Sequence, residues 1–130
     1  MPFTGRGDGC VMNMRIYPRG TTIMAIVRTI NGDVTPQEIG VVNAHDHLIR
    51  VGAGEVYIDP DHLLDDVDKA AQEASYFVEA SKRWTPTATI VDMCPASSGR
   101  GILKTLDVVA KTPGLHVVQA TGFHQQQAVS

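Results

Sequence analysis

The residues from Thr87 to Met93 (TATIVDM) form an apolar, β-branched run that has no polar face before Asp92. A run of this kind is typical of strands that are buried on both faces, as the strands of parallel sheets are. When such strands alternate with helices along the chain, they indicate a parallel sheet with right-handed crossovers. This one segment therefore favours an α/β fold in which helices flank a central strand.

The segments on either side of this run have the pattern of amphipathic helices. The first is predicted from about Pro60 to Trp84, with Asp59 or Asp61 as its cap and Pro86 ending it. Its apolar residues follow steps of three and four, which gives one stripe facing a core. The stripe contains Leu64, Val67, Ala71, Ala74 and Val78, with Leu63, Ala70 and Phe77 alongside. A second helix is predicted over 100–111, and its expected inner residues are Ile102, Leu103, Leu106, Val109 and Ala110.

Two more strands complete the pattern. Val41 to Ala44 is predicted to be the first buried strand, and Leu115 to Ala120 the third. Ahead of them, Asn31-Gly32 follows a β-type run over 22–30 and predicts a hairpin. Residues 50–58 are predicted to be a loop. The expected order is thus a hairpin followed by β-α-β-α-β.

Length and composition limit the class of protein. A chain of 130 residues fits one domain, which we expect over 22–130 after a poorly ordered leader at 1–21. A formal net charge of −3 gives no basic face, which argues against a nucleic-acid partner. No run approaches the roughly 18 apolar residues of a membrane span, so we expect no membrane partner and a soluble, cytoplasmic protein. Cys10 and Cys94 are too far apart for a Cys-x-x-Cys metal site, and they make no disulfide framework.

Two histidines separated by one residue end the first predicted strand. Successive side chains of a strand point to opposite faces, so His45 and His47 should project to one side and Asp46 to the other. Two imidazoles side by side could bind one divalent metal ion, although imidazole suits zinc, iron, nickel and copper alike. The alternative is that they are ordinary polar residues at a strand–loop junction.

Other polar residues collect at the same edge of the predicted sheet. In open parallel sheets, ligands bind at the carboxyl ends of the strands. The residues predicted at that edge are His45, His47, Asp92, Cys94 and His124, whereas His116 lies at the opposite end of its strand. This sorting favours the metal-site interpretation of the histidine pair.

The three remaining residues at this edge each have two interpretations. Asp92 either supports a metal ligand or the substrate pocket, or it bonds the backbone of the next loop. Cys94 is interpreted as a small buried residue rather than as a ligand. His124 either contributes to substrate binding or belongs to a frayed tail.

Four segments carry a resemblance to a known family, namely 27–33, 40–48, 89–100 and 117–123. In this order they resemble the phosphotriesterase-like hydrolases of the amidohydrolase superfamily, over roughly 24–124. The resemblance implies a (β/α)8 TIM barrel with a two-metal centre, commonly zinc, at the carboxyl ends of its strands. In that centre His45 and His47 would hold the more buried metal. A metal-bound hydroxide would then cleave an ester, lactone or phosphotriester bond of a small-molecule substrate.

The resemblance covers only the beginning of such a barrel, which needs about 250 residues. We therefore expect about three βα units of a TIM barrel preceded by a β-hairpin. The family's carboxylated lysine, later histidines and aspartate would come from strands beyond Ser130, so we expect this chain to be inactive alone. The alternative is a non-catalytic truncated product that acts as a weak metal-binding or interaction module, self-associating through open sheet edges.

Overall fold

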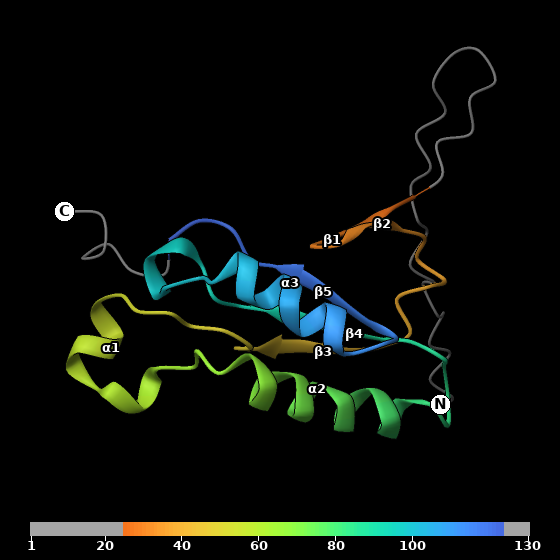
Figure 1. Cartoon of the computed structure of the whole chain (residues 1–130). Helices are drawn as coiled ribbons and strands as arrows, with labels where there is room; N and C mark the ends of the chain where they lie inside the picture. The colour runs from red at the N-terminus through yellow and green to blue at the C-terminus, as the bar shows by residue number, and fades with distance from the viewer. Residues whose placement is uncertain (1–24, 124–130) are drawn as a thin grey trace, which may run out of the picture.

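The computed structural model describes residues 25–123. A two-stranded antiparallel hairpin comes first, followed by a three-stranded parallel sheet with the strand order β3-β4-β5 (Figure 1). The strands are β1 (Val27–Thr29), β2 (Gly32–Val34), β3 (Val41–Asp46), β4 (Ala88–Asp92) and β5 (Leu115–Gln119). The predicted hairpin and the β-α-β-α-β order are confirmed. The predicted leader over 1–21 lies outside the described residues.

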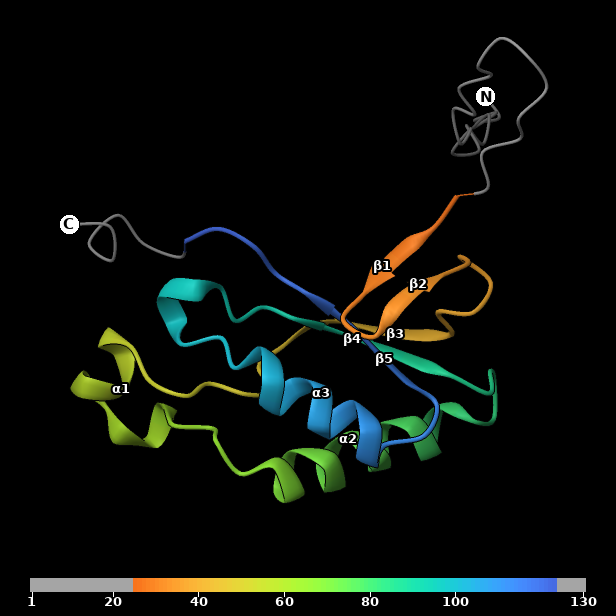
Figure 2. The ribbon, with the colours of Figure 1, turned by 45° about the horizontal axis from the view of Figure 1, so that its top comes forward.

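Two helices pack against one face of the sheet. Helix α2 (Val67–Ser81) follows β3, and α3 (Ile102–Lys111) follows β4, so that each helix is the crossover between neighbouring parallel strands (Figure 2). The buried cluster between the helices and the sheet contains Ala71, Ala74 and Val78 of α2, Val108 of α3, Ala88 and Ile90 of β4, and Leu115 and Val117 of β5. Alternate residues of β4 and β5 therefore face the helices, as the period of a strand requires.

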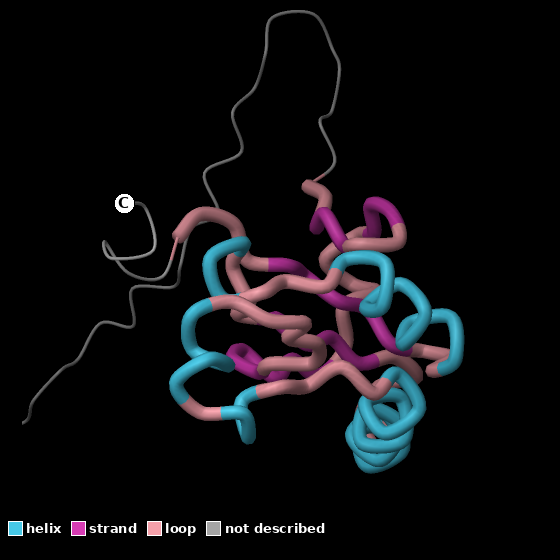
Figure 3. Tube along the Cα trace, turned by 60° about the vertical axis from the view of Figure 1, so that its left-hand side comes forward, coloured by secondary structure: helices cyan, strands magenta, loops and turns pink. Residues whose placement is uncertain are grey.

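Loops and short helices gather at the carboxyl end of the sheet. They are α1 (Gly54–Ile58) and the 3-10 helices η1 (Pro60–His62) and η2 (Ala96–Ser98). Figure 3 turns this end toward the viewer. The prediction of a loop over 50–58 is wrong in part, because Gly54–Ile58 forms α1. Within 25–123, no helix combines the length and the apolar character that a membrane crossing requires.

The single helix predicted from Pro60 to Trp84 is also wrong. The chain forms η1, breaks, and starts again at α2. The break has a tertiary cause: Leu64 leaves the helical path to exchange two backbone hydrogen bonds with Arg50, at 2.8 and 3.0 Å. Asp66 then caps α2 by accepting from the backbone amides of Asp68 and Lys69. The apolar stripe is correct inside α2, where Ala71, Ala74 and Val78 are buried.

The predicted inner face of α3 is wrong at Ile102 and Leu103, whereas Val109 packs against the core as predicted. Leu103 is 78% exposed and Ile102 is 43% exposed, while Thr105 and Val108 are fully buried. A buried threonine is tolerated here because its hydroxyl can bond within the helix, and Thr105 Oγ1 donates to the carbonyl of Gly101 at 3.0 Å. Apolar spacing alone could not reveal that threonine occupies the inner face.

Strand β3 differs from the predicted buried strand because it lies at an edge of the sheet. Its first four residues alternate between half-buried and exposed, and Val42 is 43% exposed. Strand β4 is the central strand and is buried as predicted, with Ala88, Thr89, Ile90 and Asp92 inaccessible or nearly so.

Candidate metal-binding site

The carboxyl end of β3 contains a β-bulge that the sequence did not predict. Asn43 pairs with Ile90 and Asp46 pairs with Asp92, so three steps along β3 match two steps along β4. The side chain of Asn43 stabilises the bulge from both sides. Its Nδ2 donates to Asp46 Oδ2 at 2.8 Å, and its Oδ1 accepts from the His45 backbone amide at 3.3 Å. The bulge therefore sets the direction of the residues that follow it.

The two predicted histidines lie side by side, His45 within the bulge and His47 just after it. The ring centroids of His45 and His47 are 5.4 Å apart, with an angle of 81° between the ring planes. One zinc ion bound by both rings at a tetrahedral angle would place the centroids about 5 Å apart. His45 is exposed and His47 is half-buried. The spacing is therefore compatible with one shared ion.

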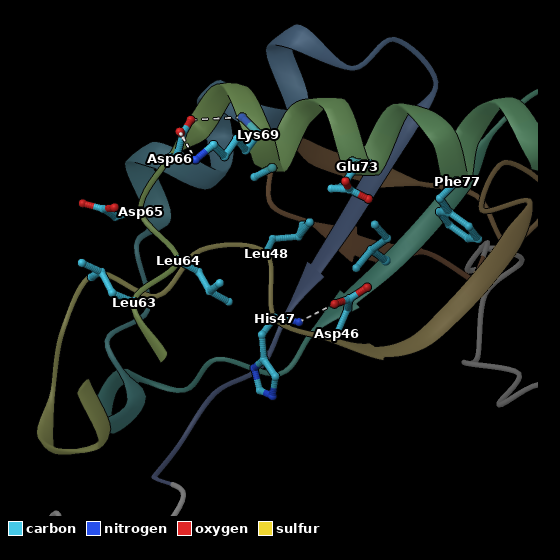
Figure 4. A pocket seen from close by; sticks show the side chains of 13 residues that line it. Asp46, His47, Leu48, Leu63, Leu64, Asp65, Asp66, Lys69, Glu73 and Phe77 are labelled. Carbon is cyan, nitrogen blue, oxygen red and sulfur yellow. Dashed lines mark hydrogen bonds and ion pairs between the residues drawn. The ribbon is translucent and has the colours of Figure 1, made fainter. Parts of the chain in front are cut away.

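Asp46 contributes to the backbone of this segment. Its Oδ1 accepts a hydrogen bond from the His47 backbone amide at 2.8 Å, and Figure 4 shows the His47 ring turned away from Leu48, Glu73 and Phe77. Those three residues line a groove of about 600 Å³ between the end of β3 and α2. The other residues lining it are Asp46, His47, Leu63, Leu64, Asp65, Asp66, Lys69, Ala70, Ala74 and Ile90. The groove thus lies mainly on the helix side of β3, with His47 at its margin.

Asp92, the last residue of β4, and Cys94, two residues beyond it, lie close to His47. The distance from His47 Nδ1 to Cys94 Sγ is 3.1 Å. Asp92 is fully buried, and its Oδ1 accepts from the Cys94 backbone amide at 3.0 Å, which is the loop-bonding role considered for this aspartate. Its Oδ2 has no hydrogen-bond partner. One potential metal-ligand atom from each of the three residues lies within 4.8 Å of the others.

This arrangement changes the interpretation of Cys94. Its predicted burial is confirmed, since the residue is 0% exposed. Its sulfur, however, is directed at a histidine 47 residues away in the chain, a contact that the sequence did not predict. The available signal was the Asp-x-Cys spacing at the end of β4, which places both side chains at the edge that also holds the histidines.

Arg50 is a charged residue of this site that sequence reasoning missed. It is 8% exposed, its Nη1 lies 3.4 Å from Glu55 Oε2, and its Nε is buried without a partner. Burial, and then the Arg50 charge, lower the pKa of His47. Burial, and then the charge of Asp92, raise the pKa of Cys94 to about 12, against a smaller opposing effect of Arg50. Near neutral pH, His47 is therefore a neutral imidazole and Cys94 a thiol.

His116 lies away from this cluster. His116 is near the start of β5, at the opposite end of the sheet, as expected. His124 lies outside the described residues.

Comparison with known proteins identifies the family. The phosphotriesterase family profile matches residues 25–129, which is most of the chain. The chain belongs to the phosphotriesterase family. It is 37% identical over 100 residues to a phospho-furanose lactonase of Mycoplasmopsis agalactiae, covering 76% of this chain and 27% of that protein. A phospho-furanose lactonase of Mycoplasmopsis synoviae is 36% identical over 100 residues, covering 75% of this chain and 27% of that protein.

Solved structures of the family support the fold. An amidohydrolase from Mycoplasma synoviae superposes with a TM-score of 0.72 at 33% identity, covering 81% of this chain and 29% of that one. A lactonase from Listeria monocytogenes gives 0.69 at 28% identity, covering 80% and 30%. The chain thus spans less than a third of these phosphotriesterase-family barrels. The predicted partial (β/α)8 barrel is confirmed, and the hydrolase family that the resemblance implied is the correct one.

Proposed function

We propose that this chain supplies the first metal-binding segment of a metal-dependent hydrolase that cleaves lactone, ester or phosphotriester bonds. The observation that carries the proposal is the histidine pair, whose rings lie 5.4 Å apart at the carboxyl end of β3 in a phosphotriesterase-family chain. Two relatives named as phospho-furanose lactonases favour a small sugar-like lactone as the substrate class.

The residues of this chain suit a divalent ion, and zinc is the favoured identity. Imidazole nitrogens bind zinc well, and His47 is neutral because burial and Arg50 lower its pKa, so that one ring nitrogen keeps a lone pair for a metal. When bound, the ion would lower the pKa of a water molecule and polarise the substrate carbonyl or phosphoryl oxygen. Asn43 and Asp46 hold the backbone on both sides of His45, and Asp46 accepts from the amide of His47. These bonds would fix the direction of both rings.

A first experiment tests the ligand assignment in the 130-residue chain. The purified chain with added zinc is assayed for hydrolysis of a γ-lactone and of a p-nitrophenyl ester. We expect no hydrolysis above that of free zinc, because catalytic zinc sites normally use three protein ligands and the pair provides two. Robust turnover by the chain alone would contradict this assignment.

A second experiment tests the function itself. Residues 25–119 replace the matching N-terminal segment of the Mycoplasmopsis agalactiae lactonase, and the chimera is assayed for lactone hydrolysis with zinc. The chimera should be active, and His45→Asn and His47→Asn should each lower kcat/KM at least about 100-fold, since a ligand of the metal is lost. His62→Asn is the matched control, because His62 is an exposed histidine of η1. Activity that survives both replacements in a folded chimera would refute the proposal.

Self-association is a separate part of the proposal. Strand β3 has a neighbour on one side only among the described strands, and Val42 on it is 43% exposed. An unpaired edge of this kind favours pairing with another chain. Size-exclusion chromatography of the 130-residue chain tests this, and a monomer at all concentrations would contradict it.

A further inference from the structure

Three side chains with different donor atoms meet at the carboxyl ends of β3 and β4. They are His47, Asp92 and Cys94, and one ligand atom from each lies within 4.8 Å of the other two. Neighbouring donors in a tetrahedral zinc site are about 3.5 Å apart. The distance from His47 Nδ1 to Cys94 Sγ, 3.1 Å, is already close to that value. Small rotations of the side chains would therefore bring all three donors around one ion.

The buried carboxylate of Asp92 gives an independent reason to expect a cation here. Asp92 is 0% exposed, and its Oδ2 has no hydrogen-bond partner. An unpaired buried carboxylate oxygen costs free energy unless a proton or a cation compensates it. A divalent ion between Asp92, His47 and Cys94 would supply that compensation.

We propose that His47, Asp92 and Cys94 form a thiolate-containing binding site for a divalent metal ion. A set of one nitrogen, one sulfur and one oxygen suits zinc or cobalt, whereas magnesium and calcium prefer oxygen ligands alone. Water would complete a four-coordinate shell, as in zinc sites with three protein ligands.

The proton balance of binding is simple. The thiol of Cys94 becomes a thiolate when the metal–sulfur bond forms, and its proton passes to the solvent. His47 binds as a neutral imidazole and Asp92 as a carboxylate, so neither releases a proton. Each bound ion should therefore release about one proton. The Asp92 carboxylate and the Cys94 thiolate would attract the metal ion more strongly than the single positive charge of Arg50 would repel it. Arg50 also has its own ion pair with Glu55.

This site and the proposed hydrolytic centre share His47. The inference rests on the proposed function only because both assign a metal ion to this residue. A neutral imidazole has one lone pair, so an ion here and an ion between His45 and His47 exclude each other. Within the described residues, three donors that include a thiolate should outcompete two imidazoles. We therefore expect the 130-residue chain to bind its first ion through Cys94.

The experiment is a cobalt titration of the full 130-residue chain under anaerobic, reducing conditions. We expect a sulfur-to-cobalt charge-transfer band in the near ultraviolet together with the visible bands of tetrahedral cobalt, and displacement of both by zinc. A pH indicator in weak buffer should report about one proton released per ion. X-ray absorption at the zinc edge should show one sulfur at about 2.3 Å.

Four variants assign the ligands. Cys94→Ser should abolish the charge-transfer band and the proton release, and Asp92→Asn should weaken cobalt binding at least about tenfold. Cys10→Ser is the matched thiol control and should keep the band, and His45→Asn should keep the affinity. Circular dichroism of each metal-free variant checks its folding. If Cys94→Ser unfolds, Cys10→Ser still assigns the sulfur, because the chain has two cysteines and a band that survives in Cys10→Ser comes from Cys94.

The outcomes separate this inference from the proposed function. A metal shell of nitrogen and oxygen alone overturns the inference, and so does a band that is lost in Cys10→Ser instead of Cys94→Ser. Binding that needs His45 but not Cys94 overturns it too, while leaving the hydrolase proposal intact. An inactive chimera combined with a thiolate-bound ion in the chain would refute the hydrolase proposal and support this site.

Discussion

Gly101 precedes α3 and lies against Ile49, a fully buried side chain two residues after the histidine pair. A Cβ atom added to Gly101 would lie 2.5 Å from Ile49 Cγ2 and 2.9 Å from Val51 Cγ1. Ile49 is 0% exposed and β-branched, so its methyl group cannot rotate freely out of the way. The backbone φ of Gly101 is −103°, an ordinary value, so any cost of a substitution comes from packing. We predict that Gly101→Ala destabilises the fold through this one contact.

The expected magnitude follows from two opposing effects. Overpacking a well-packed site costs about 1–3 kcal/mol. Replacing glycine by alanine also restricts the unfolded chain, which returns about 0.4–1 kcal/mol. The net loss of unfolding free energy should be about 0.5–2 kcal/mol. Ile49→Ala alone should cost about 2–5 kcal/mol, because it leaves a cavity in the core.

The double variant Gly101→Ala/Ile49→Ala decides whether the contact is the cause. The new methyl group should then occupy space that Ile49 has vacated, so the double variant should be more stable than the sum predicts by at least about 1 kcal/mol. Urea unfolding of the four proteins, followed by far-ultraviolet circular dichroism, measures this coupling. Additivity within about 0.5 kcal/mol, or a stabilising Gly101→Ala, would refute the reasoning.

Three further predictions test the helices and turns. The pKa of Asp66 lies below its ordinary value of 3.8 because backbone amides in the first turn of α2 donate to the carboxylate. The ionised carboxylate therefore stabilises the fold above pH 3.8, and this stabilisation is lost as the pH falls through the lowered pKa. Asp66→Ala should therefore lower Tm near about pH 6 but not near about pH 2, and an equal effect at both would contradict this. Gly40→Ala should cost more than about 2 kcal/mol in urea unfolding, because φ is +62° and the new Cβ would lie 1.9 Å from a backbone carbonyl oxygen. Gly54→Ala, with open space around it, is the near-neutral control. Val108→Ala should lower the unfolding free energy by about 2 kcal/mol. Leu103→Ala should change it very little, because Val108 is 0% exposed and Leu103 is 78% exposed. A larger loss in Leu103→Ala than in Val108→Ala would instead support the inner face of α3 that apolar spacing predicts.

The strands and their order could be predicted because their signals are local and redundant. The apolar run of β4 indicated a central parallel strand, and the Asn31-Gly32 pair indicated the hairpin turn. The helices were less predictable. The apolar spacing continues through Leu64, but backbone bonds to Arg50 take this residue out of the helix. On α3, Thr105 is buried while Leu103 is exposed, because a hydroxyl group bonded within the helix is tolerated in the core.

The amino-acid sequence by itself determined the parallel α/β order, the family, and the placement of two histidines on one side of a strand end. The order and the placement of the histidines follow from alternation and strand direction, and the family from short matching segments, so all three are properties of neighbouring residues. Only the tertiary structure decided which other residues contact the two histidines. The bulge in β3 and the register of β3 against β4 bring Cys94 to His47 across 47 positions of the chain and leave one oxygen of Asp92 without a partner. Such distances depend on how separate segments pack, and no pattern within a single segment specifies them.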